Sequence, residues 1–123
     1  MKNYFENETG CNCSCGTDNL SSRLLRIINE IRDDIGVPLY LNSACRCPEY
    51  NEKVGGVPNS AHVATEEKPG EAVDIRCPNS SLRFNLLMLL LVHGIKRVGI
   101  YPSFIHADID KDKPQEVIWY SKR

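Results

Sequence analysis

Two short segments in which apolar and polar residues alternate constrain the fold of this chain more than any other feature. They lie at residues 71–75 and 104–110. Successive side chains of a β-strand point to opposite faces, so this alternation predicts strands with one face on a hydrophobic core and the other face polar. The polar face of the first strand carries Asp74, and that of the second carries His106 and Asp108. The sequence therefore predicts a sheet whose polar face holds groups able to bind a metal.

The remaining patterns predict helices packed on this sheet. Ser21 or Ser22 offers an N-cap to a first amphipathic helix, which Gly36 closes. The first helix is expected over the apolar spacing from Leu24 to Ile35, and two more helices are expected at 48–54 and about 81–93. The expected strands cover 38–44, 71–77, 96–101, 104–110 and 116–120. Helices followed by a C-terminal run of strands indicate an α+β fold with a small antiparallel sheet of about four strands packed by helices. The helix at 81–93 is apolar almost all round, so we expect it to be well buried.

Length and composition predict one domain with a short arm. The chain has 123 residues, of which 41% are hydrophobic, enough for a single core. Residues 1–19 are polar and irregular, so we expect a cysteine-containing N-terminal arm followed by a folded domain over 20–123. The net charge of −1 argues against partners recognised through phosphate charge. We therefore expect no nucleic-acid partner, no membrane partner and a monomer.

The N-terminus has no apolar segment of the kind that a secretory signal needs. The longest apolar run, residues 86–92, is far shorter than the roughly 20 residues that span a bilayer. We therefore expect the protein to be made in the cytoplasm without a signal peptide. If it acts outside the membrane, another component must release it.

The chain has six cysteines whose role the sequence does not determine: Cys11, Cys13, Cys15, Cys45, Cys47 and Cys77. Without a secretory signal, thiols or metal ligation are favoured over a disulfide framework. The dense Cys-x-Cys-x-Cys arm can hold zinc, although structural zinc sites usually combine two CxxC-like pairs. Two alternatives remain: a structural metal or disulfide that joins the arm to Cys47 or Cys77, and a set of free, partly buried thiols.

His62, Asp74 and His106 form a candidate metal site. Two imidazoles and one carboxylate are a three-point ligand set for zinc, and they leave a fourth position for the water molecule that a hydrolytic site needs. Each residue also has a simpler interpretation: a surface loop histidine, a carboxylate paired with an arginine, and the outer face of an amphipathic strand. Arg46, between a strand and a helix, is either a surface arginine or a group that grips a carboxylate or polarises a carbonyl.

Four motifs occur in order along the chain. They are SACRCPEYN at 43–51, VGGVPNSAH at 54–62, GEAVDI at 70–75 and GIYPSFIHAD at 99–108. Together they resemble the D-alanyl-D-alanine carboxypeptidase family of zinc peptidases, which includes vancomycin-resistance carboxypeptidases and phage endolysins that cut peptidoglycan stem peptides. The resemblance covers about residues 20–120. It implies the fold shared with the hedgehog signalling domain.

The resemblance implies a zinc ligand at each of three positions. His62 and Asp74 match a Ser-x-His…Gly-x-Ala-x-Asp motif, and His106 matches the late strand histidine. Eleven residues, 63–73, separate the first two ligands here, which is more than is usual in the family. Residues 64–69 therefore look like an insertion that lengthens the rim of the cleft without moving the ligands.

The resemblance also implies how substrate is held. Arg46 belongs to a Ser-x-x-Arg motif that begins at Ser43, and it would hold the substrate carboxylate or the scissile carbonyl. Ser60 would support the site near the loop histidine. Cys45 stands where many relatives have tyrosine.

The general base is the second departure from the family. Many members carry an acidic residue three positions before the last histidine, where this chain has Ser103. Asp108, two residues after His106 on the same strand face, is the nearest replacement and is assigned as the catalytic base. The alternative is that Asp108 orients a metal ligand.

The resemblance implies a zinc-dependent metallopeptidase with peptidoglycan peptide as its substrate. Cleavage would be that of a D-Ala-D-Ala carboxypeptidase or of an endolysin-type, L-alanyl-D-glutamate-type endopeptidase. Action at the cell wall would follow a phage-type release. The alternative is a non-catalytic zinc-containing module of the same fold that binds cell-wall peptide or a protein. The missing acidic residue at position 103 favours that alternative.

Overall fold

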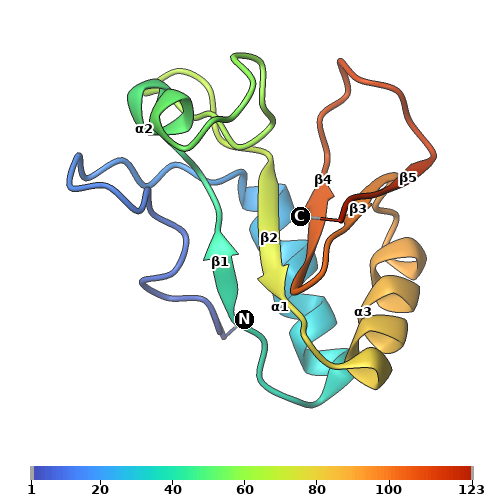
Figure 1. Cartoon of the computed structure of the whole chain (residues 1–123). Coiled ribbons are helices and arrows are strands. Elements are labelled where there is room, and N and C mark those ends of the chain that lie inside the picture. Colours follow the sequence, from blue (N-terminus) through green and yellow to red (C-terminus); the bar gives the residue numbers. More distant parts are fainter. Residues whose placement is uncertain (1, 123) are drawn as a thin grey trace.

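A computed structural model describes residues 2–122 as a five-stranded sheet with two long helices on one face (Figure 1). The helices are α1 (Ser22–Ile35), α2 (Pro48–Lys53) and α3 (Ser80–Val92), and the strands are β1 (Leu41–Ser43), β2 (Ala72–Arg76), β3 (Arg97–Ile100), β4 (Phe104–Asp108) and β5 (Val117–Tyr120). The predicted α+β fold class is confirmed. No helix within residues 2–122 has both the length and the apolar character needed to cross a membrane.

All five expected strands are present and join one sheet, which is larger than the expected sheet of about four strands and is mixed. Its order is β1-β2-β4-β3-β5, with β3 and β5 parallel and all other neighbours antiparallel. Residues 109–116 carry the chain from β4 past β3, so that β5 joins the far edge. The predicted sheet of about four antiparallel strands differs in these two respects, because turn residues predict where a chain reverses but not which strand it then pairs with.

Helix α1 begins and ends where its sequence predicts. The hydroxyl of Ser21 accepts a hydrogen bond from the backbone N–H of Leu24, which selects Ser21 as the N-cap. Gly36 ends the helix with φ of 73°, a left-handed conformation that glycine adopts at little cost. The buried stripe of α1 packs against α3 and the sheet; its apolar members are Leu24, Ile27, Ile28 and Ile31.

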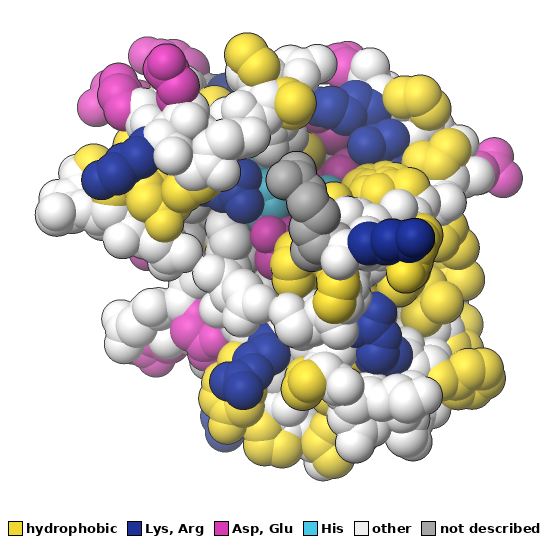
Figure 2. Space-filling model, in the orientation of Figure 1, with side chains coloured by type: hydrophobic (Ala, Val, Ile, Leu, Met, Phe, Trp, Pro, Cys, Tyr) yellow, Lys and Arg dark blue, Asp and Glu magenta, His cyan; other side chains and the backbone are white. Residues whose placement is uncertain are grey.

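Helix α3 is less buried than its sequence suggests. Leu86 and Leu90, one turn apart, are fully buried, whereas Phe84 is 70% exposed and Val92 is 73% exposed. The prediction of a well-buried helix is therefore wrong. Only the stripe that faces α1 and β4 is covered, because none of residues 2–122 forms a further layer outside α3. Hydrophobic side chains accordingly gather on this side of the molecule in Figure 2.

The alternation in β2 and β4 separates the two faces of the sheet as predicted. Val73 and Ile75 of β2, with Ile105 and Ala107 of β4, belong to the core beneath the helices. The intervening residues of both strands point to the opposite face, which neither long helix covers. This open face is where the polar residues of β2 and β4 meet.

The residues before α1 lie along β1 and contribute to the core. Phe5 is fully buried in the same cluster as the helices. The carboxylate of Glu8 accepts a hydrogen bond of 2.9 Å from the backbone N–H of Leu41, and the side-chain amide of Asn12 donates one of 3.1 Å to the carbonyl of Asn42. The arm is thus packed on the domain at its first strand.

We predict that Phe5→Ala destabilises the whole domain by about 3–5 kcal/mol, the usual range for loss of a buried aromatic side chain. The matched control is Phe84→Ala, because the side chain of Phe84 is 70% exposed and its loss should change little. Urea unfolding of both variants measures the free energy of unfolding. Equal, small effects in the two variants would show that the arm does not belong to the cooperative core.

Candidate metal centre

One row of residues crosses the open face of the sheet through all five strands. The strand register places Ser43 opposite Asp74, Asp74 opposite His106, and His106 opposite Gly99, which in turn lies beside Trp119. Side chains at paired positions of neighbouring strands point to the same face and lie close together. The two strand residues of the predicted site are therefore neighbours because of the register of β2 and β4.

His62 reaches the same point from the loop before β2. The backbone of Arg46 fixes this loop: its N–H donates to the carbonyl of His62 at 2.7 Å, and its carbonyl accepts from the N–H of Ala64 at 2.8 Å. The hydroxyl of Ser60 accepts a further bond of 3.2 Å from the backbone N–H of His62. As a result the imidazole of His62 is only 3% exposed although it belongs to a loop.

The three side chains converge on one carboxylate oxygen. Nε2 of His62 lies 3.2 Å, and Nδ1 of His106 2.9 Å, from Oδ1 of Asp74. The two imidazole rings meet edge to face, with centroids 5.1 Å apart. One donor atom from each residue falls within 4.8 Å of the other two. In Figure 2 histidine side chains are visible in a hollow near the middle of this face, between acidic and basic side chains.

The opposite nitrogen of each imidazole is already occupied. Nδ1 of His62 lies 2.6 Å from the carbonyl oxygen of Ala44, which can only accept a hydrogen bond, so this nitrogen carries the proton. Nε2 of His106 lies 2.7 Å from Oδ2 of Asp108, and with this nitrogen protonated the lone pair of neutral His106 is on Nδ1. In the neutral rings the lone pairs are then on Nε2 of His62 and Nδ1 of His106, the two nitrogens that lie beside Oδ1 of Asp74. Ligating histidines commonly have such a second partner, which fixes the tautomer and the ring orientation.

The surroundings of Asp74 and His106 favour the ionised forms of these two groups. Burial raises the pKa of Asp74, but hydrogen bonds from His106 and His62 outweigh it and hold that pKa well below its usual value. Burial lowers the pKa of His106, but hydrogen bonds to Asp108 and Asp74 outweigh it and raise that pKa. An imidazole that attracts a proton this strongly when no metal is bound releases that proton when a cation takes its place.

The donor set fits zinc. Two neutral imidazole nitrogens and one carboxylate oxygen are a common combination at a zinc site that keeps one position open for reaction. Arg46 is the cation that already neutralises part of the carboxylate charge, since its Nη2 lies 3.6 Å from Oδ2 of Asp74. The carboxylate is therefore partnered on both oxygens, and the simple interpretation of Asp74 as an arginine partner accounts for only one of them.

Arg46 is held in place by residues on both sides of it. Its Nε donates to the hydroxyl of Ser43 at 3.2 Å, and its Nη1 donates to Oδ1 of Asn51 at 3.3 Å. Asn51, on α2, is buried, and Gly56 passes so close that a β-carbon there would lie 2.1 Å from Oδ1 of Asn51. Sequence reasoning missed Asn51; its signal was the asparagine among charged residues on the short helix, followed by paired glycines.

Asp108 lies behind His106 and has both oxygens engaged. It is 1% exposed; Oδ2 bonds to His106, while Oδ1 accepts from Nε of Arg97 at 2.8 Å and from the backbone N–H of Asp110 at 3.1 Å. Its assignment as general base stays a prediction, and these contacts favour the alternative in which it orients His106. Ser103 lies exposed in the turn between β3 and β4.

Trp119 forms a wall of the site that the sequence did not indicate. Its indole lies 5.4 Å from the ring of His106 and 5.1 Å from the guanidinium of Arg97, measured between ring centroids and to the guanidinium carbon. Gly99 makes room for it, because a β-carbon at position 99 would lie 2.5 Å from the indole. A glycine inside a strand is the signal that predicts such a close approach, although it does not name the partner.

The longer separation of His62 and Asp74 is absorbed outside the site. Residues 65–69 are exposed and contain a tight turn, in which the N–H of Thr65 bonds to the carbonyl of Lys68 at 2.9 Å. Gly70 then packs against Cys45, because a β-carbon at position 70 would lie 2.8 Å from the β-carbon of Cys45. The added length forms a surface turn and leaves the two ligands together, as the sequence led us to expect.

The comparison with known families covers most of the chain. The family model described as Peptidase M15 matches residues 2–108, which include the arm, Arg46, all three candidate ligands and Asp108. No curated protein matches the chain. The match extends from the N-terminal arm to the end of β4 and thus includes β1 to β4 and the loop that carries His62, but not Trp119 of β5. This chain therefore belongs to the Peptidase M15 family of zinc-dependent metallopeptidases, which act on peptidoglycan.

Proposed function

We propose that this chain hydrolyses a peptide bond next to a D-amino acid in peptidoglycan stem peptides, with zinc held by His62, Asp74 and His106. The observation that carries the proposal is the convergence of one ring nitrogen from each of two imidazoles on one buried carboxylate oxygen. Family membership supplies the general activity. The proposal adds the ligands, the residues that hold substrate and the kind of bond that is cut.

The protein prepares its ligands before a metal binds. Bound zinc supplies Lewis acidity, which activates water near neutral pH and polarises a carbonyl group. The backbone carbonyl of Ala44 and the carboxylate of Asp108 hold the two imidazoles in the tautomers that ligation requires. Little reorganisation is then needed, because each ring already directs its lone pair toward the metal position.

Arg46 is the residue that we propose to hold substrate. Its side chain is 17% exposed, and Ser43 and Asn51 bind two of its three nitrogens. The third nitrogen lies beside Asp74, so the guanidinium borders the metal position. A guanidinium fixed there can bind a substrate carboxylate or stabilise the oxyanion that forms at the scissile carbonyl. Ser60 supports the site indirectly through the backbone of His62.

A fixed guanidinium next to the metal favours a substrate with a free carboxylate, and therefore a cut at the C-terminal D-amino acid. In that mode the chain acts as a D-Ala-D-Ala carboxypeptidase at the cell wall, after a phage-type release. Incubation of the zinc-loaded protein with purified stem peptides, followed by mass spectrometry, separates the two modes. Alanine alone as the released product supports the carboxypeptidase, whereas a larger fragment identifies the endopeptidase.

A second candidate function is a zinc-containing module that binds cell-wall peptide without cutting it. Two observations favour it: Ser103 stands where relatives carry an acidic residue, and both oxygens of Asp108 are engaged in hydrogen bonds. The same stem-peptide assay distinguishes the candidates, because a binding module retains the peptide intact. Binding without any product after prolonged incubation would contradict the peptidase.

We predict that His106→Ala lowers the zinc content by one equivalent per chain and abolishes hydrolysis, because the strand ligand is lost. His93→Ala is the matched control, since His93 pairs with Asp34 and Glu30, two acidic side chains of α1. Zinc is measured by elemental analysis and hydrolysis by release of product from stem peptide. Full zinc content and full activity in His106→Ala would remove this site from the mechanism.

Asp108→Asn tests whether this residue orients His106 or acts as the base. We expect zinc affinity to fall about 10- to 100-fold, the usual cost of losing a partner of a ligating histidine. Asp112→Asn, the same change at an exposed position nearby, should leave the affinity unchanged. Competition with a chelating dye measures the affinity. Unchanged zinc affinity together with lost turnover would support the base instead.

A further inference from the structure

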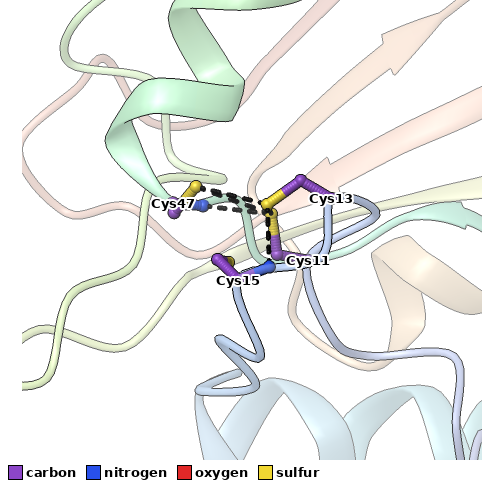
Figure 3. Close-up of side chains that lie close together, drawn as sticks. All are labelled: Cys11, Cys13, Cys15 and Cys47. Carbon is purple, nitrogen blue, oxygen red and sulfur yellow. Dashed lines mark hydrogen bonds between the residues drawn. The ribbon is translucent and has the colours of Figure 1, made fainter.

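Four of the six cysteines gather at one point outside the candidate active site. Cys11, Cys13 and Cys15 come from the N-terminal arm, and Cys47 immediately precedes α2 (Figure 3). The four sulfur atoms all lie within 4.8 Å of one another. We infer that Cys11, Cys13, Cys15 and Cys47 bind a zinc ion through four thiolates and that this ion fastens the arm to the domain.

The spacing of the sulfur atoms fits a tetrahedral site. The Sγ atoms of Cys11 and Cys13 are 3.4 Å apart, those of Cys13 and Cys47 are 3.7 Å apart, and those of Cys11 and Cys47 are 3.8 Å apart. Zinc–sulfur bonds of about 2.3 Å at tetrahedral angles place sulfur atoms about 3.8 Å from each other. Three sulfurs at similar separations are what a shared ion needs, whereas a disulfide would single out one pair.

Each of the four sulfurs also accepts one backbone hydrogen bond. The N–H groups of Cys47, Cys15, Thr17 and Tyr50 donate to the sulfurs of Cys11, Cys13, Cys15 and Cys47 respectively, each at 3.4 Å. Hydrogen bonds of this kind stabilise negative charge on sulfur and orient the ligands of a metal site. Four separate backbone donors aimed at four sulfurs are a second observation, independent of the sulfur spacing.

The other two cysteines show that this grouping is selective. Cys45 is buried with its sulfur 3.0 Å from the carbonyl oxygen of Thr9, to which it donates. Cys77 is fully buried in the hydrophobic core. Cys45 stands only two residues before Cys47, yet neither it nor Cys77 joins the cluster. Of the two partners that the sequence left open for the arm, the structure therefore selects Cys47.

A metal that joins the arm to the domain would stabilise a segment that has little regular secondary structure. Between residues 2 and 21 the described chain forms only turns and one isolated bridge, so regular hydrogen bonding contributes little. Phe5 and Thr9 are its only buried residues. Four thiolates make a closed site for a metal without redox chemistry, which is the structural use of zinc. The ion would join residues 11–15 to Cys47, the residue immediately before α2.

Metal analysis of the intact chain, purified under reducing conditions with zinc, tests this inference. We expect two zinc ions per chain, one for each ligand group. Cys13→Ser should retain one and His106→Ala should retain one, so each site is lost separately. Cys77→Ala, which removes a thiol outside the cluster, should retain both. One zinc ion in the wild type that Cys13→Ser does not remove, or iron at the cysteines, would overturn the zinc assignment.

Cobalt substitution distinguishes this site from the candidate active site. Thiolate ligation of Co²⁺ gives an intense sulfur-to-metal charge-transfer absorption, which imidazole and carboxylate ligands do not give. The band should persist in His106→Ala and disappear in Cys13→Ser. A band missing from the wild type would contradict the inference, whatever the peptidase assay shows.

A third test uses the wild-type protein, so its result does not depend on whether the cysteine variants fold. Titration with an organomercurial, which reacts with thiolates, should release one zinc ion per chain to a chelating dye while the metal at the histidine site stays bound. Release of no zinc would overturn the inference. So would a Cys11–Cys13 disulfide found by mass spectrometry in the protein as isolated.

Discussion

The buried carboxylate of Asp74 is the constraint on which the rest of the structure depends. A carboxylate that is only 6% exposed is strongly unfavourable unless charge and hydrogen bonds compensate it. Here Oδ1 faces imidazole nitrogens of His62 and His106, and Oδ2 faces the guanidinium of Arg46. These partners come from a loop, from the neighbouring strand and from the segment before α2. Three distant segments must therefore meet at one residue of β2, and the loop bonds and strand register described above bring them there.

Acidic and basic side chains alternate outward from Asp74, so that each buried charge has a partner of opposite sign. His106 bridges Asp74 and Asp108, and Asp108 in turn pairs with Arg97, whose guanidinium lies over the ring of Trp119. Each link is a cross-strand or same-face contact, so the order of the sheet determines the order of the charges. Binding of a cation at Asp74 would change the protonation of His106, and through it the hydrogen bond that His106 makes with Asp108. This coupling explains why Asp108 resembles a support of His106 more than an independent base.

The sequence predicted those features that local pattern controls. Alternation identified the faces of β2 and β4, and capping residues located α1, because both depend on near neighbours in the chain. The parallel pairing of β5 was missed, since pairing depends on where residues 109–116 lead the chain. Trp119 was missed for the same reason, although Gly99 signalled a close approach. The exposure of α3 depends on whether another layer of the protein covers its outer side, and the periodicity of its apolar residues does not predict that.

Arg46 and Cys47 connect the two groups of candidate ligands. They are adjacent in the chain, yet the side chain of Arg46 faces Asp74, whereas the sulfur of Cys47 faces the arm. The backbone of Arg46 also holds His62 through the hydrogen bonds between their segments. A shift of this segment would therefore move the guanidinium that we propose to bind substrate and the histidine that we propose to bind zinc. If a metal fixes Cys47 to the arm, it also restrains this segment on the side of Cys47. The cysteine-rich arm would then support the proposed active site, because it would limit the movement of the segment that carries Arg46 and holds His62.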